Sequence, residues 1–552
     1  MSIKSKYRSG ISSIKDVPVL IVGGGPVGLS LALALARQNI CSLVVERHPG
    51  TTQHPRARGV NVRTMELFRQ WGNDTELLQY EQPKEARRFI WVESFQGKEV
   101  TRIATDDSNT RIYSPMQVSL VAQDCTEQSL YHALLNYAAA EVQFLKEFIA
   151  FEEDAAGITA RILDKETNQE KLIKARYLIA ADGAHSHIRK QLGITMDGPD
   201  NLGQSCSIYC EIDISTWTKH RPCAGFIFAD PKLFHRPYFA TVNGANRWIV
   251  MLRFNTGDSK GTFTDEYCIN EIRRAVNLPN LEVNIINKSF WTMAAQIAKQ
   301  YRKNRVFLAG DAAHRLPPTG GFGMNTGIQD VHNLAWKLAF VINHHVADSL
   351  LDTYYDERAP IAKQNIEWST ENAKLYVEIY QAISMGDMER LKIKLHEQHR
   401  NLNFTGLDLG FIYHSSAIKS ENNQILSISP SKYVPTTLPG SRAPHLMLIK
   451  NGKSISIFDI FEKDFVLLIG SKGEPWRTAA NELSKTLPFI LKIYMIATNG
   501  DLVDPDNHWH DIYTVTPSGA VLVRPDGHVA WRSISMVYEP KVELQKYLDV
   551  FK

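Results

Sequence analysis

Residues 17–46 read VPVLIVGGGPVGLSLALALARQNICSLVVE, a stretch that predicts a strand, a glycine turn, a helix and a second strand. Residues 19–22 form a continuous apolar run, typical of parallel strands that are buried on both faces. An Ala/Leu-rich helix is expected over 29–37 and a second strand over 41–45. The apolar run 17–36 also resembles a secretory signal or a short membrane span. The GGGP in its middle argues against both, because glycine and proline break a helical apolar core.

The glycine turn has the spacing G-x-G-x-x-G, with Gly23, Gly25 and Gly28 between the strand and the helix. This spacing allows a tight turn and lets the backbone approach a pyrophosphate at the helix N-terminus. Glu46 ends the second strand 18 residues after Gly28, where its carboxylate suits a ribose 2′-hydroxyl and repels a 2′-phosphate. The unit therefore predicts a site for FAD or NAD rather than NADP. The residues assigned to the cofactor here are Gly23, Gly25, Pro26, Val27, Gly28, Glu46 and Arg47.

Two later strands also end in an acidic residue beside a glycine. Residues 177–186, YLIAADGAHS, place Asp182 after a buried strand, although an ordinary Asp-Gly turn explains that residue equally well. Residues 305–314, RVFLAGDAAH, place Asp311 at the carboxyl end of a strand, where α/β sheets bind ligands. A carboxylate at that position accepts hydrogen bonds from a polyol such as ribitol.

A glycine-rich stretch, PPTGGFGMN at 317–325, follows the strand that ends at Asp311 and leads into a helix expected from about Asn325. The free N–H groups and the positive dipole end of a helix stabilise negative charge, as a reduced flavin requires. The sequence therefore predicts a flavin site built from three separated segments.

The composition excludes several classes of protein. The 552 residues, 44% hydrophobic and 22% charged, are ordinary for a globular chain of roughly three domains and do not fit a disordered one. A net charge of +3, with scattered basic residues, gives no footprint for nucleic acid. No cysteine pair has C-x-x-C spacing, so buried thiols in a reducing compartment are expected rather than a zinc site or disulfides. The cysteines are Cys41, Cys125, Cys206, Cys210, Cys223 and Cys268.

Changes of pattern divide the chain into further regions. Alternating residues over about 88–118 and 204–292 predict a mostly antiparallel sheet that interrupts the nucleotide-binding domain. Helical patterns dominate 326–400, and the Ser/Pro/Asn-rich stretch 415–439 predicts a linker before a compact αβ segment. Further helices are expected over 56–71, 123–140 and 476–487, and a hairpin over 520–531.

The three motifs, in this order, resemble those of the class A flavoprotein monooxygenases, the para-hydroxybenzoate hydroxylase fold. Residues 323–338 (GMNTGIQDVHNLAWKL) and 355–360 (YDERAP) are similar to the phenol and aromatic polyketide hydroxylase branch. The tail, from GSRAP at 440–444 to VRPDG at 523–527, resembles the thioredoxin-like C-terminal domain of that branch.

This resemblance implies an α/β fold with a discontinuous Rossmann-like FAD domain, an inserted mostly antiparallel β-sheet substrate domain and a thioredoxin-like α/β tail. The expected boundaries are 17–87, 119–203 and 293–400 for the FAD domain with its further helices, 88–118 and 204–292 for the substrate domain, 401–439 for a linker and 440–552 for the tail.

The resemblance also implies roles for individual residues. It places the adenosine ribose on Glu46, the pyrophosphate on Arg58, with Arg56 as the alternative, and the ribitol on Gln123 and Asp311. The remaining implied FAD positions are Asp182, Gly310 and the backbone of Gly323, Met324 and Asn325.

Pro318 falls where this family has a proline whose carbonyl faces the substrate and the reactive edge of the flavin, and it is the catalytic position implied. Phe322 replaces a polar residue often found nearby. The tail has no cysteine after Cys268, so thiol–disulfide exchange is not expected and a packing or association role is.

The implied reaction uses NADPH or NADH as a transient co-substrate, and O₂, to hydroxylate a phenolic or polycyclic, polyketide-like aromatic through a flavin C4a-hydroperoxide. We expect a cytoplasmic monomer or homodimer with no metal, no nucleic acid and no membrane span. A Baeyer–Villiger or epoxidising monooxygenase of the same fold stays open, as does a non-catalytic flavin-binding protein. The W-x-W-x-I-P motif of flavin-dependent halogenases is absent from the sequence.

Substrate contacts are expected on the sheet that covers the flavin, because an aromatic pocket suits a planar ligand. Aromatic residues in strands more often fill a core, so we expect only about a third of the candidates to touch substrate. The candidates are Phe226, Phe228, Tyr238, Phe239 and Trp248, with Phe234, His235 and Arg253 beside them.

Overall fold

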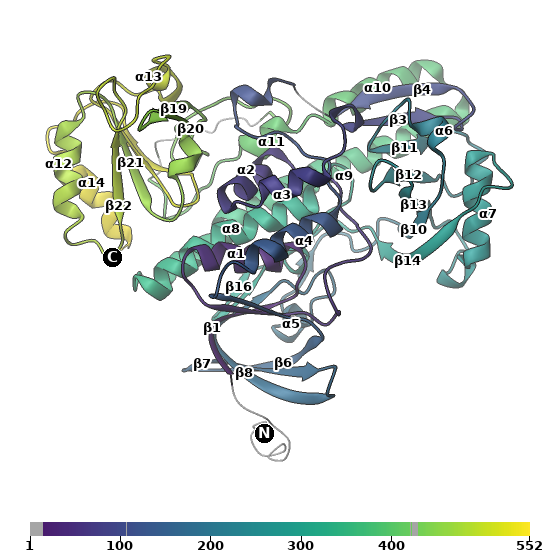
Figure 1. Cartoon of the computed structure of the whole chain (residues 1–552), viewed down its shortest axis with the longest axis horizontal. Helices are drawn as coiled ribbons and strands as arrows, with labels where there is room; N and C mark the ends of the chain where they lie inside the picture. The colour runs from purple at the N-terminus through teal and green to yellow at the C-terminus, as the bar shows by residue number, and fades with distance from the viewer. Residues whose placement is uncertain (1–14, 106–107, 420, 422–428, 552) are drawn as a thin grey trace.

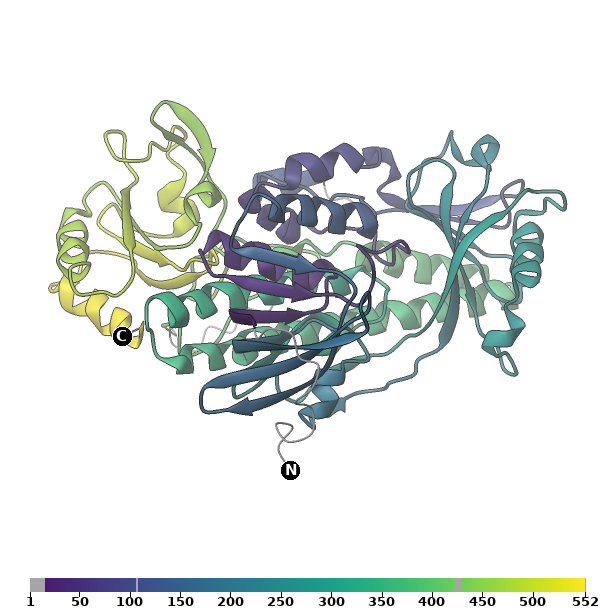
Figure 2. The same cartoon turned by 60° about the horizontal axis from the view of Figure 1, so that its bottom comes forward.

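The computed structural model of the chain describes residues 15–105, 108–419, 421 and 429–551. Figure 1 shows a central α/β body flanked on one side by a largely antiparallel sheet and on the other by the yellow-green C-terminal body. When the molecule is turned, the strands of the central sheet lie side by side with helices packed against them (Figure 2).

The central sheet has β1 (Lys15–Val22) in its middle, between β2 (Ser42–Val45) and β8 (Gln169–Ala180), and is parallel to both. Residues Val19–Val22 are all buried, as expected of an apolar strand covered on both faces. β17 (Val306–Leu308) lies parallel beside β8. The carboxyl ends of β1, β8 and β17 therefore meet at one edge, which brings the three sequence motifs together. The other strands of this sheet are β5 (Ala140–Gln143), β6 (Lys146–Asp154), β7 (Gly157–Asp164) and β16 (Arg302–Lys303).

Two helices that follow these strands, α1 (Pro26–Arg37) and α8 (Phe322–Asn343), contribute to the same hydrophobic core as the sheet. α8 begins at Phe322, before the predicted start near Asn325. The reason is the backbone of Gly321, whose left-handed conformation (φ +70°) ends the preceding loop and places the first helical turn directly after it.

Two other helices are shorter than the sequence predicted. α2 (Val62–Trp71) begins at Val62 rather than at residue 56, because Asn61 caps it by accepting the N–H of Thr64. α4 (Gln123–Leu134) ends at Leu134 rather than at residue 140, where β5 already begins. The residues before α2 are thus a loop that crosses the edge where the motifs meet.

The second sheet unites segments that are more than a hundred residues apart in sequence. Its elements are β3 (Arg88–Val92), β4 (Glu99–Ala104), β10 (Gln204–Glu211), β11 (Gly225–Phe228), β12 (Tyr238–Thr241), β13 (Arg247–Arg253) and β14 (Asn284–Thr292). They run in the order β14-β10-β13-β12-β11-β3-β4. β3 is parallel to β11, and the other neighbours are antiparallel.

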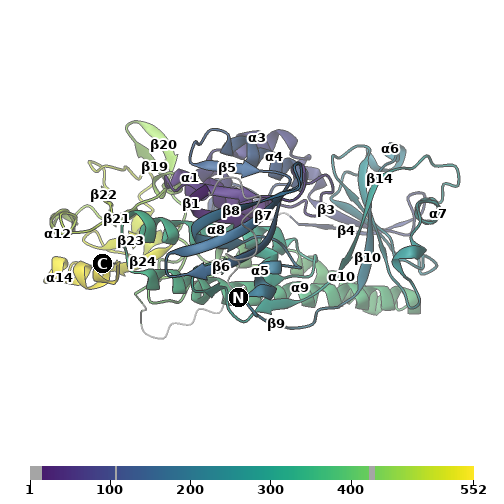
Figure 3. The ribbon, with the colours of Figure 1, turned by 90° about the horizontal axis from the view of Figure 1, so that it is seen from below.

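This sheet is covered on both faces. α7 (Asp265–Val276) packs on one face, and α9 (Thr353–Met385) and α10 (Met388–Asn401) pack on the other. Seen from below, α9 runs from the central body to the sheet (Figure 3). The face covered by α9 is thus the one that meets the central body.

The C-terminal body is a sheet in the order β22-β21-β23-β24 with helices against it. Its strands and helices are β19 (Met447–Lys450), β20 (Lys453–Ser456), β21 (Phe465–Ile469), α12 (Glu474–Leu483), β22 (Leu491–Met495), α13 (Trp509–Tyr513), β23 (Ala520–Val523), β24 (Val529–Ser533) and α14 (Pro540–Leu548). The core is continuous with that of the central body, because Phe465 packs edge to face on Trp336 and Phe340 of α8. The tail is therefore fused to the central body through apolar packing.

The structure describes only part of the segment that the sequence predicts as a linker. Residues 420 and 422–428 lie outside the described part, while α11 (Thr405–Leu409) forms before them and Phe411 and Tyr413 are buried. Among the described helices, none is both long and apolar enough to cross a membrane. The six cysteines all lie in the described residues as free thiols, and Cys206 and Cys210 are buried.

The remaining short elements complete the chain. They are α3 (Asp74–Leu77), α5 (His187–Gln191), β9 (Met196–Asp197), α6 (Ser215–Thr218), β15 (Gln296–Ala298) and β18 (His314–Arg315).

Candidate functional site

The glycines of the first turn differ in what surrounds them. A Cβ on Gly23 would lie 2.2 Å from the carbonyl oxygen of Ala181, and one on Gly28 would lie 2.0 Å from that of Gly23. A Cβ placed on Gly25 would have no described atom within 4 Å. Gly23 and Gly28 are therefore fixed by close packing of the turn, whereas Gly25 leaves open space at the N-terminus of α1 where a phosphate can approach.

Glu46 is held against this turn. One carboxylate oxygen accepts the N–H of Gly24 at 2.7 Å, and the other accepts the N–H of His48 at 2.9 Å. The half-buried carboxylate thus stands at the end of β2 beside the phosphate-sized space, with its neighbour Arg47 exposed. This placement fits a ribose hydroxyl next to a pyrophosphate.

Asp182 follows β8 and is divided between two roles. Its Oδ2 accepts the N–H of His187 at 2.9 Å and so caps α5, while its buried Oδ1 finds no partner among the described residues. Burial raises the pKa of this carboxyl. Arg189, from α5, donates to the carbonyl oxygens of Ala312 at 2.9 Å and Ala184 at 3.1 Å. The second motif is thereby tied to the third.

Asp311 follows β17 and is left open. The residue keeps solvent-accessible surface, and its carboxylate accepts no hydrogen bond from any residue that the structure describes. Surrounding atoms nevertheless raise the pKa of this carboxyl, an effect that His314, Arg56 and Arg315 oppose. The preceding Gly310 packs tightly, because a Cβ on it would lie 2.9 Å from Val27 of α1. A Cβ on Gly327 of α8 would lie 2.6 Å from the side chain of the same valine, so both glycines pack closely on it. A rigid backbone therefore presents a free carboxylate, which suits binding of a hydroxylated ligand.

The start of α8 is anchored by Asn325. Its amide donates to the carbonyl oxygens of Gly59 at 3.1 Å and Gly321 at 2.8 Å, and its oxygen accepts the N–H of Asn61 at 3.0 Å. The first turn of a helix leaves N–H groups without intrahelical partners. Gly323 stands in that turn with no described atom within 4 Å of its Cβ position, and Met324 is half-buried.

The proline loop before α8 is turned on itself. Pro318 is exposed, and its carbonyl oxygen accepts the N–H of Gly321 at 3.1 Å. Phe322 is buried and packs on Phe404, with ring centroids 4.8 Å apart. The phenyl ring that replaces an expected polar residue therefore fills a core position.

The loop before α2 places two arginines differently from the expectation. Arg58 donates to Ala224 O at 2.7 Å and to Tyr238 Oη at 2.9 Å, so its guanidinium lies on the second sheet rather than beside the glycine turn. The side chain of Arg56 is exposed and has no acceptor among the described residues. Of the two arginines, Arg56 is thus the one whose guanidinium is not already hydrogen-bonded to a described residue, while the pyrophosphate contact of either stays a prediction.

Gln123 holds this loop in place. Its Oε1 accepts the N–H groups of Arg56 and Ala57, each at 3.1 Å, and its Nε2 donates to Glu127 at 2.8 Å. Glu127 also accepts the N–H of Thr52 at 2.6 Å, and burial raises its pKa to about 7. Gln123 therefore shapes the loop that carries Arg56 and is already bonded within the protein.

The predicted substrate residues fall on opposite faces of the second sheet. Tyr238 lies on the face that meets the central body, where it contacts Arg58 and the cluster around Ala240 and Ile249. The physical reason is the two-residue period of a strand, which composition alone does not place on one face or the other. The four that instead pack in the core with Phe95 and α7 are Phe226, Phe228, Phe239 and Trp248.

The other three candidates are also separated. His235 is buried and hydrogen-bonded to Tyr267 at 2.6 Å, and Phe234 is exposed. Arg253 alternates along β13 with Ile249 and Met251, which places it on the central-body face, near Arg236 and Tyr380 and without a carboxylate partner in the described part of the chain. Strand alternation together with the apolar face of α7 was the signal that could have sorted these residues.

Comparisons with known proteins agree with this geometry. Residues 16–369 match a family model described as an FAD binding domain, and residues 436–550 match one described as the C-terminal domain of aromatic-ring hydroxylases. The chain is 34% identical to tetracenomycin A2 monooxygenase-dioxygenase of Streptomyces glaucescens, over 97% of each chain. It is 30% identical to phenol 2-monooxygenase of Pseudomonas sp. (strain EST1001), over 97% of this chain and 92% of that one.

Solved structures extend the likeness to three dimensions. The flavin-dependent monooxygenase PieE, in complex with FAD and substrate, superposes with a TM-score of 0.91 and 31% identity, covering 97% of this chain and 99% of that one. Aklavinone-11 hydroxylase, in a ternary complex with FAD and aklavinone, superposes with a TM-score of 0.85 and 30% identity, covering 98% and 100%.

Proposed function

The chain belongs to the class A flavoprotein monooxygenases, in the branch with the aromatic-ring hydroxylase C-terminal domain, and from this premise we propose that it hydroxylates a polycyclic phenol. The predicted fold class, the FAD cofactor and the monooxygenase activity with O₂ and a reduced nicotinamide are confirmed. The individual site residues and the substrate are the part that we propose.

One observation carries the proposal: a single loop joins the start of α8 to the second sheet. Asn325 donates to Gly59 O at 3.1 Å, and the neighbouring Arg58 donates to Tyr238 Oη at 2.9 Å. The helix end assigned to the flavin therefore faces the sheet surface that carries Tyr238. We place the reacting ring of the substrate between them.

The residues at the sheet edge fit FAD: Arg56 and Asp311 have no hydrogen-bond partner for their charged atoms among the described residues, and the two oxygens of Glu46 each keep a lone pair beyond the N–H group that they accept. We assign Glu46 to the ribose, Arg56 to the pyrophosphate, Asp311 to the ribitol and the first turn of α8 to the isoalloxazine. Bound FAD supplies the activation of O₂ after a nicotinamide has reduced it. We assign to the chain itself the support of negative charge on the ring, through the N-terminus of α8.

The substrate side favours a planar, acidic aromatic. Tyr238 and Tyr380 line the face that meets the central body, and Arg253 brings a positive charge without a carboxylate partner among the described residues. Burial, and then the neighbouring Arg236, lower the pKa of Arg253. An ionised phenol relieves this unfavourable environment and becomes more electron-rich, which is what hydroxylation requires. Names such as tetracenomycin A2 monooxygenase-dioxygenase and aklavinone-11 hydroxylase support a polyketide-like substrate.

The test is to mix the purified holoprotein with NADPH or with NADH and a panel of monocyclic and polycyclic phenols. A substrate should accelerate bleaching of the flavin, and labelled O₂ should place one oxygen atom on its ring. If no compound accelerates bleaching, the hydroxylase proposal fails and a non-catalytic flavoprotein is supported. A product that is a lactone or an epoxide would move the chain to the Baeyer–Villiger or epoxidising reaction.

The substrate face is tested with a matched pair of variants. Arg253→Met should raise KM for an ionised phenol roughly tenfold or more, since it removes a charged hydrogen bond, and should leave the FAD content unchanged. Trp248→Phe should leave KM within about twofold, because the Trp248 side chain packs in the core on the opposite face of the sheet and does not reach the proposed substrate side; any loss should appear in stability instead. Equal effects of the two substitutions would place the substrate elsewhere.

We propose further that the enzyme works in the cytoplasm as a monomer or homodimer. Free thiols at all six cysteines and the need for NAD(P)H support a reducing compartment. Cell fractionation and sedimentation of the purified holoenzyme test the two statements separately.

A further inference from the structure

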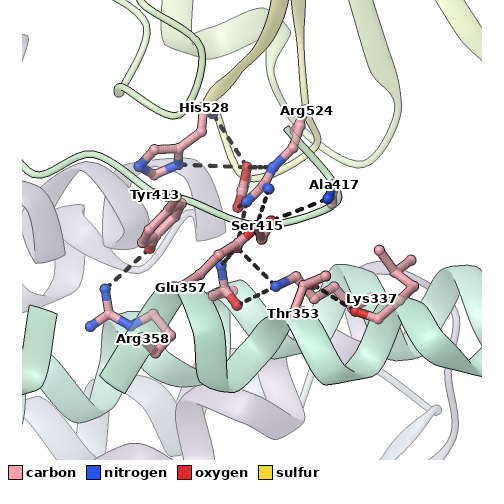
Figure 4. Close-up of polar contacts among 12 residues, drawn as sticks. Lys337, Thr353, Glu357, Arg358, Tyr413, Ser415, Ala417, Arg524 and His528 are labelled. Carbon is pink, nitrogen blue, oxygen red and sulfur yellow. Dashed lines mark hydrogen bonds and ion pairs between the residues drawn. The ribbon is translucent and has the colours of Figure 1, made fainter. Parts of the chain in front are cut away.

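A line of buried charged and polar side chains connects the Gly310–Asp311 turn with the C-terminal body. Figure 4 shows the part of it between α9 and the tail, with Glu357 and Arg358 below and Arg524 and His528 above. It passes from the central sheet through α8 and α9 to the hairpin β23–β24. No residue in it is needed for the contacts assigned to FAD or substrate above. Its members are His314, Asp330, Lys337, Glu357, Arg358, Tyr413, Arg524, Asp526 and His528.

The first link is Asp330 of α8, which lies directly beneath the turn. Its carboxylate accepts the N–H of Gly310 at 3.3 Å, lies 2.5 Å from Nε2 of His314 and accepts Nε of Arg358 at 2.8 Å. Burial alone raises the pKa of Asp330, but His314 and Arg358 outweigh it and hold the pKa below its usual value. The turn is therefore hydrogen-bonded to an ionised carboxylate.

The second link is Arg358 of α9. Its Nη1 donates to the hydroxyl of Tyr413 at 3.1 Å, and its Nη2 donates to the carbonyl oxygen of Thr326 at 3.2 Å. The ring of Tyr413 lies against that of His528, in the turn between β23 and β24, with ring centroids 4.3 Å apart. Arg358 thus contacts both the helix under the turn and the segment that packs on the tail.

The third link fixes the tail hairpin to α9. Arg524 donates to both oxygens of Glu357, at 2.6 Å and 2.9 Å, and is also paired with Asp526. Lys337 donates to the same carboxylate at 2.8 Å. Burial raises the pKa of Glu357, but Arg524 and Lys337 hold it far below its usual range. Glu357 and Arg358 are adjacent, so one turn of α9 holds both the tail and the flavin turn.

From these contacts we propose that the C-terminal domain positions the flavin-binding turn through the chain Asp330–Arg358–Tyr413. In this arrangement, docking of the tail and binding of FAD stabilise one another. Arg358 and Tyr413 are positioning residues, since they act through Asp330 and Gly310. The proposal rests on the assignment of Asp311 to FAD made above.

The turn has little freedom to absorb a displacement of Asp330. Gly310 is enclosed by Val27 and Gly327, with its Cβ position 2.9 Å from Val27 and its Cα 3.0 Å from the Cβ position of Gly327. A shift of the carboxylate therefore moves the backbone that presents Asp311. Buried ion pairs add little net stability, so a line of them is better suited to fixing a geometry.

The test uses the full-length protein with Tyr413→Phe, which removes one hydroxyl and keeps the ring. The matched control is Tyr433→Phe, because Arg442 donates to Tyr433 Oη at 3.2 Å in a second buried cluster that holds the tail to Glu66 of α2. We expect Tyr413→Phe to raise the Kd for FAD by about three- to tenfold, the worth of one buried hydrogen bond, and Tyr433→Phe to change it less than twofold. FAD binding should also slow amide exchange in the hairpin, as reciprocity of coupled sites requires.

Two results would overturn the proposal. One is equal Kd changes, or none, in the two variants, which would make the tail a general support only. The other is identical hairpin exchange in apoprotein and FAD-loaded wild type, a measurement that needs no variant. Because both readouts use FAD alone, they stay separate from the hydroxylase test, which depends on substrate-accelerated bleaching.

Discussion

The cofactor edge and the tail interface use the same charged residue types in opposite ways. At the edge, Asp311 and Arg56 are solvent-accessible residues whose side chains form no hydrogen bond or close ion pair with a described side chain, although Arg56 is near enough to lower the pKa of Asp311. At the interface, Glu357 and Arg524 are fully buried, and their charged atoms are bonded to one another and to Lys337 or Asp526.

This difference separates ligand-binding groups from structural ones. A charge left open on a rigid backbone gains its partner only from a ligand, whereas a buried charge is stable only when the protein supplies the partner. Substitutions at the edge should therefore change FAD binding and spare the fold. Substitutions at the interface should change the free energy of unfolding first.

The largest expected effect is at the interface. Arg524→Ala leaves Glu357 and Asp526 buried with one partner fewer, so we expect it to lower the free energy of unfolding by about 3–5 kcal/mol. Chemical denaturation of the apoprotein measures this. Arg477→Ala is the control in the same domain, because its pair with Asp501 is part-exposed and is worth about 1 kcal/mol or less. Similar losses in both would remove the distinction.

Next comes the open carboxylate at the edge. Asp311→Ala should weaken FAD binding by about 10- to 100-fold, the worth of a charged hydrogen bond, with apoprotein stability changed by less than about 1 kcal/mol. Equilibrium dialysis gives the Kd, and thermal unfolding of the apoprotein gives the stability. Stoichiometric flavin retained through dialysis would count against the assignment of Asp311.

A pH-dependent effect should appear at the interface. Burial lowers the pKa of His528 to about 4, although Asp526 opposes this, and Arg63 and Arg524 add to it. The unfolded chain takes up a proton near pH 6.5 and the folded chain only near pH 4, so stability is lost as the pH falls through this window. Between pH 7 and pH 5 the loss is on the order of 2 kcal/mol. His528→Gln should reduce, by this amount, the loss in the free energy of unfolding between pH 7 and pH 5, measured by chemical denaturation at each pH. If the variant loses as much stability as the wild type over this range, the effect belongs to another group.

The smallest effect separates the two arginines of one loop. Arg56→Gln should weaken FAD binding by about three- to tenfold, since it removes an exposed charge near the pyrophosphate. Arg58→Gln should instead change substrate-accelerated flavin reduction, because Arg58 is bonded to Tyr238 on the sheet. Comparing the Kd for FAD with KM for substrate in both variants tests this. If Arg58→Gln weakened FAD binding and Arg56→Gln changed only KM, the pyrophosphate contact would belong to Arg58.

The sequence predicted the parts of the site that depend on local patterns. Gly23, Gly28 and Glu46 lie within one βαβ unit, and the strands before Asp182 and Asp311 are marked by continuous apolar runs. The rule that parallel strands align their carboxyl ends was then enough to bring these residues together.

The rest depends on contacts that no local pattern records. Tyr238 and Phe239 are adjacent and chemically alike, yet strand alternation sends one toward the central body and the other into the core under α7. Glu357 and Arg524 are 167 residues apart, and each looks like an ordinary surface charge until α9 meets the tail hairpin. The domain boundaries and the FAD and substrate contacts stay predictions.

The strand order has a consequence for how the protein is made. β1 is synthesised first, but two strands on the same side of it in the sheet come much later: β8 begins at Gln169 and β17 at Val306. Phe465, which packs on Trp336 of α8, is synthesised later still. Throughout translation the nascent chain therefore carries uncovered apolar strands and, near the end, an uncovered aromatic patch on α8. Such surfaces aggregate or recruit chaperones. When expressed, fragments that stop before the tail at residue 440 should accumulate as inclusion bodies, and the full chain should not.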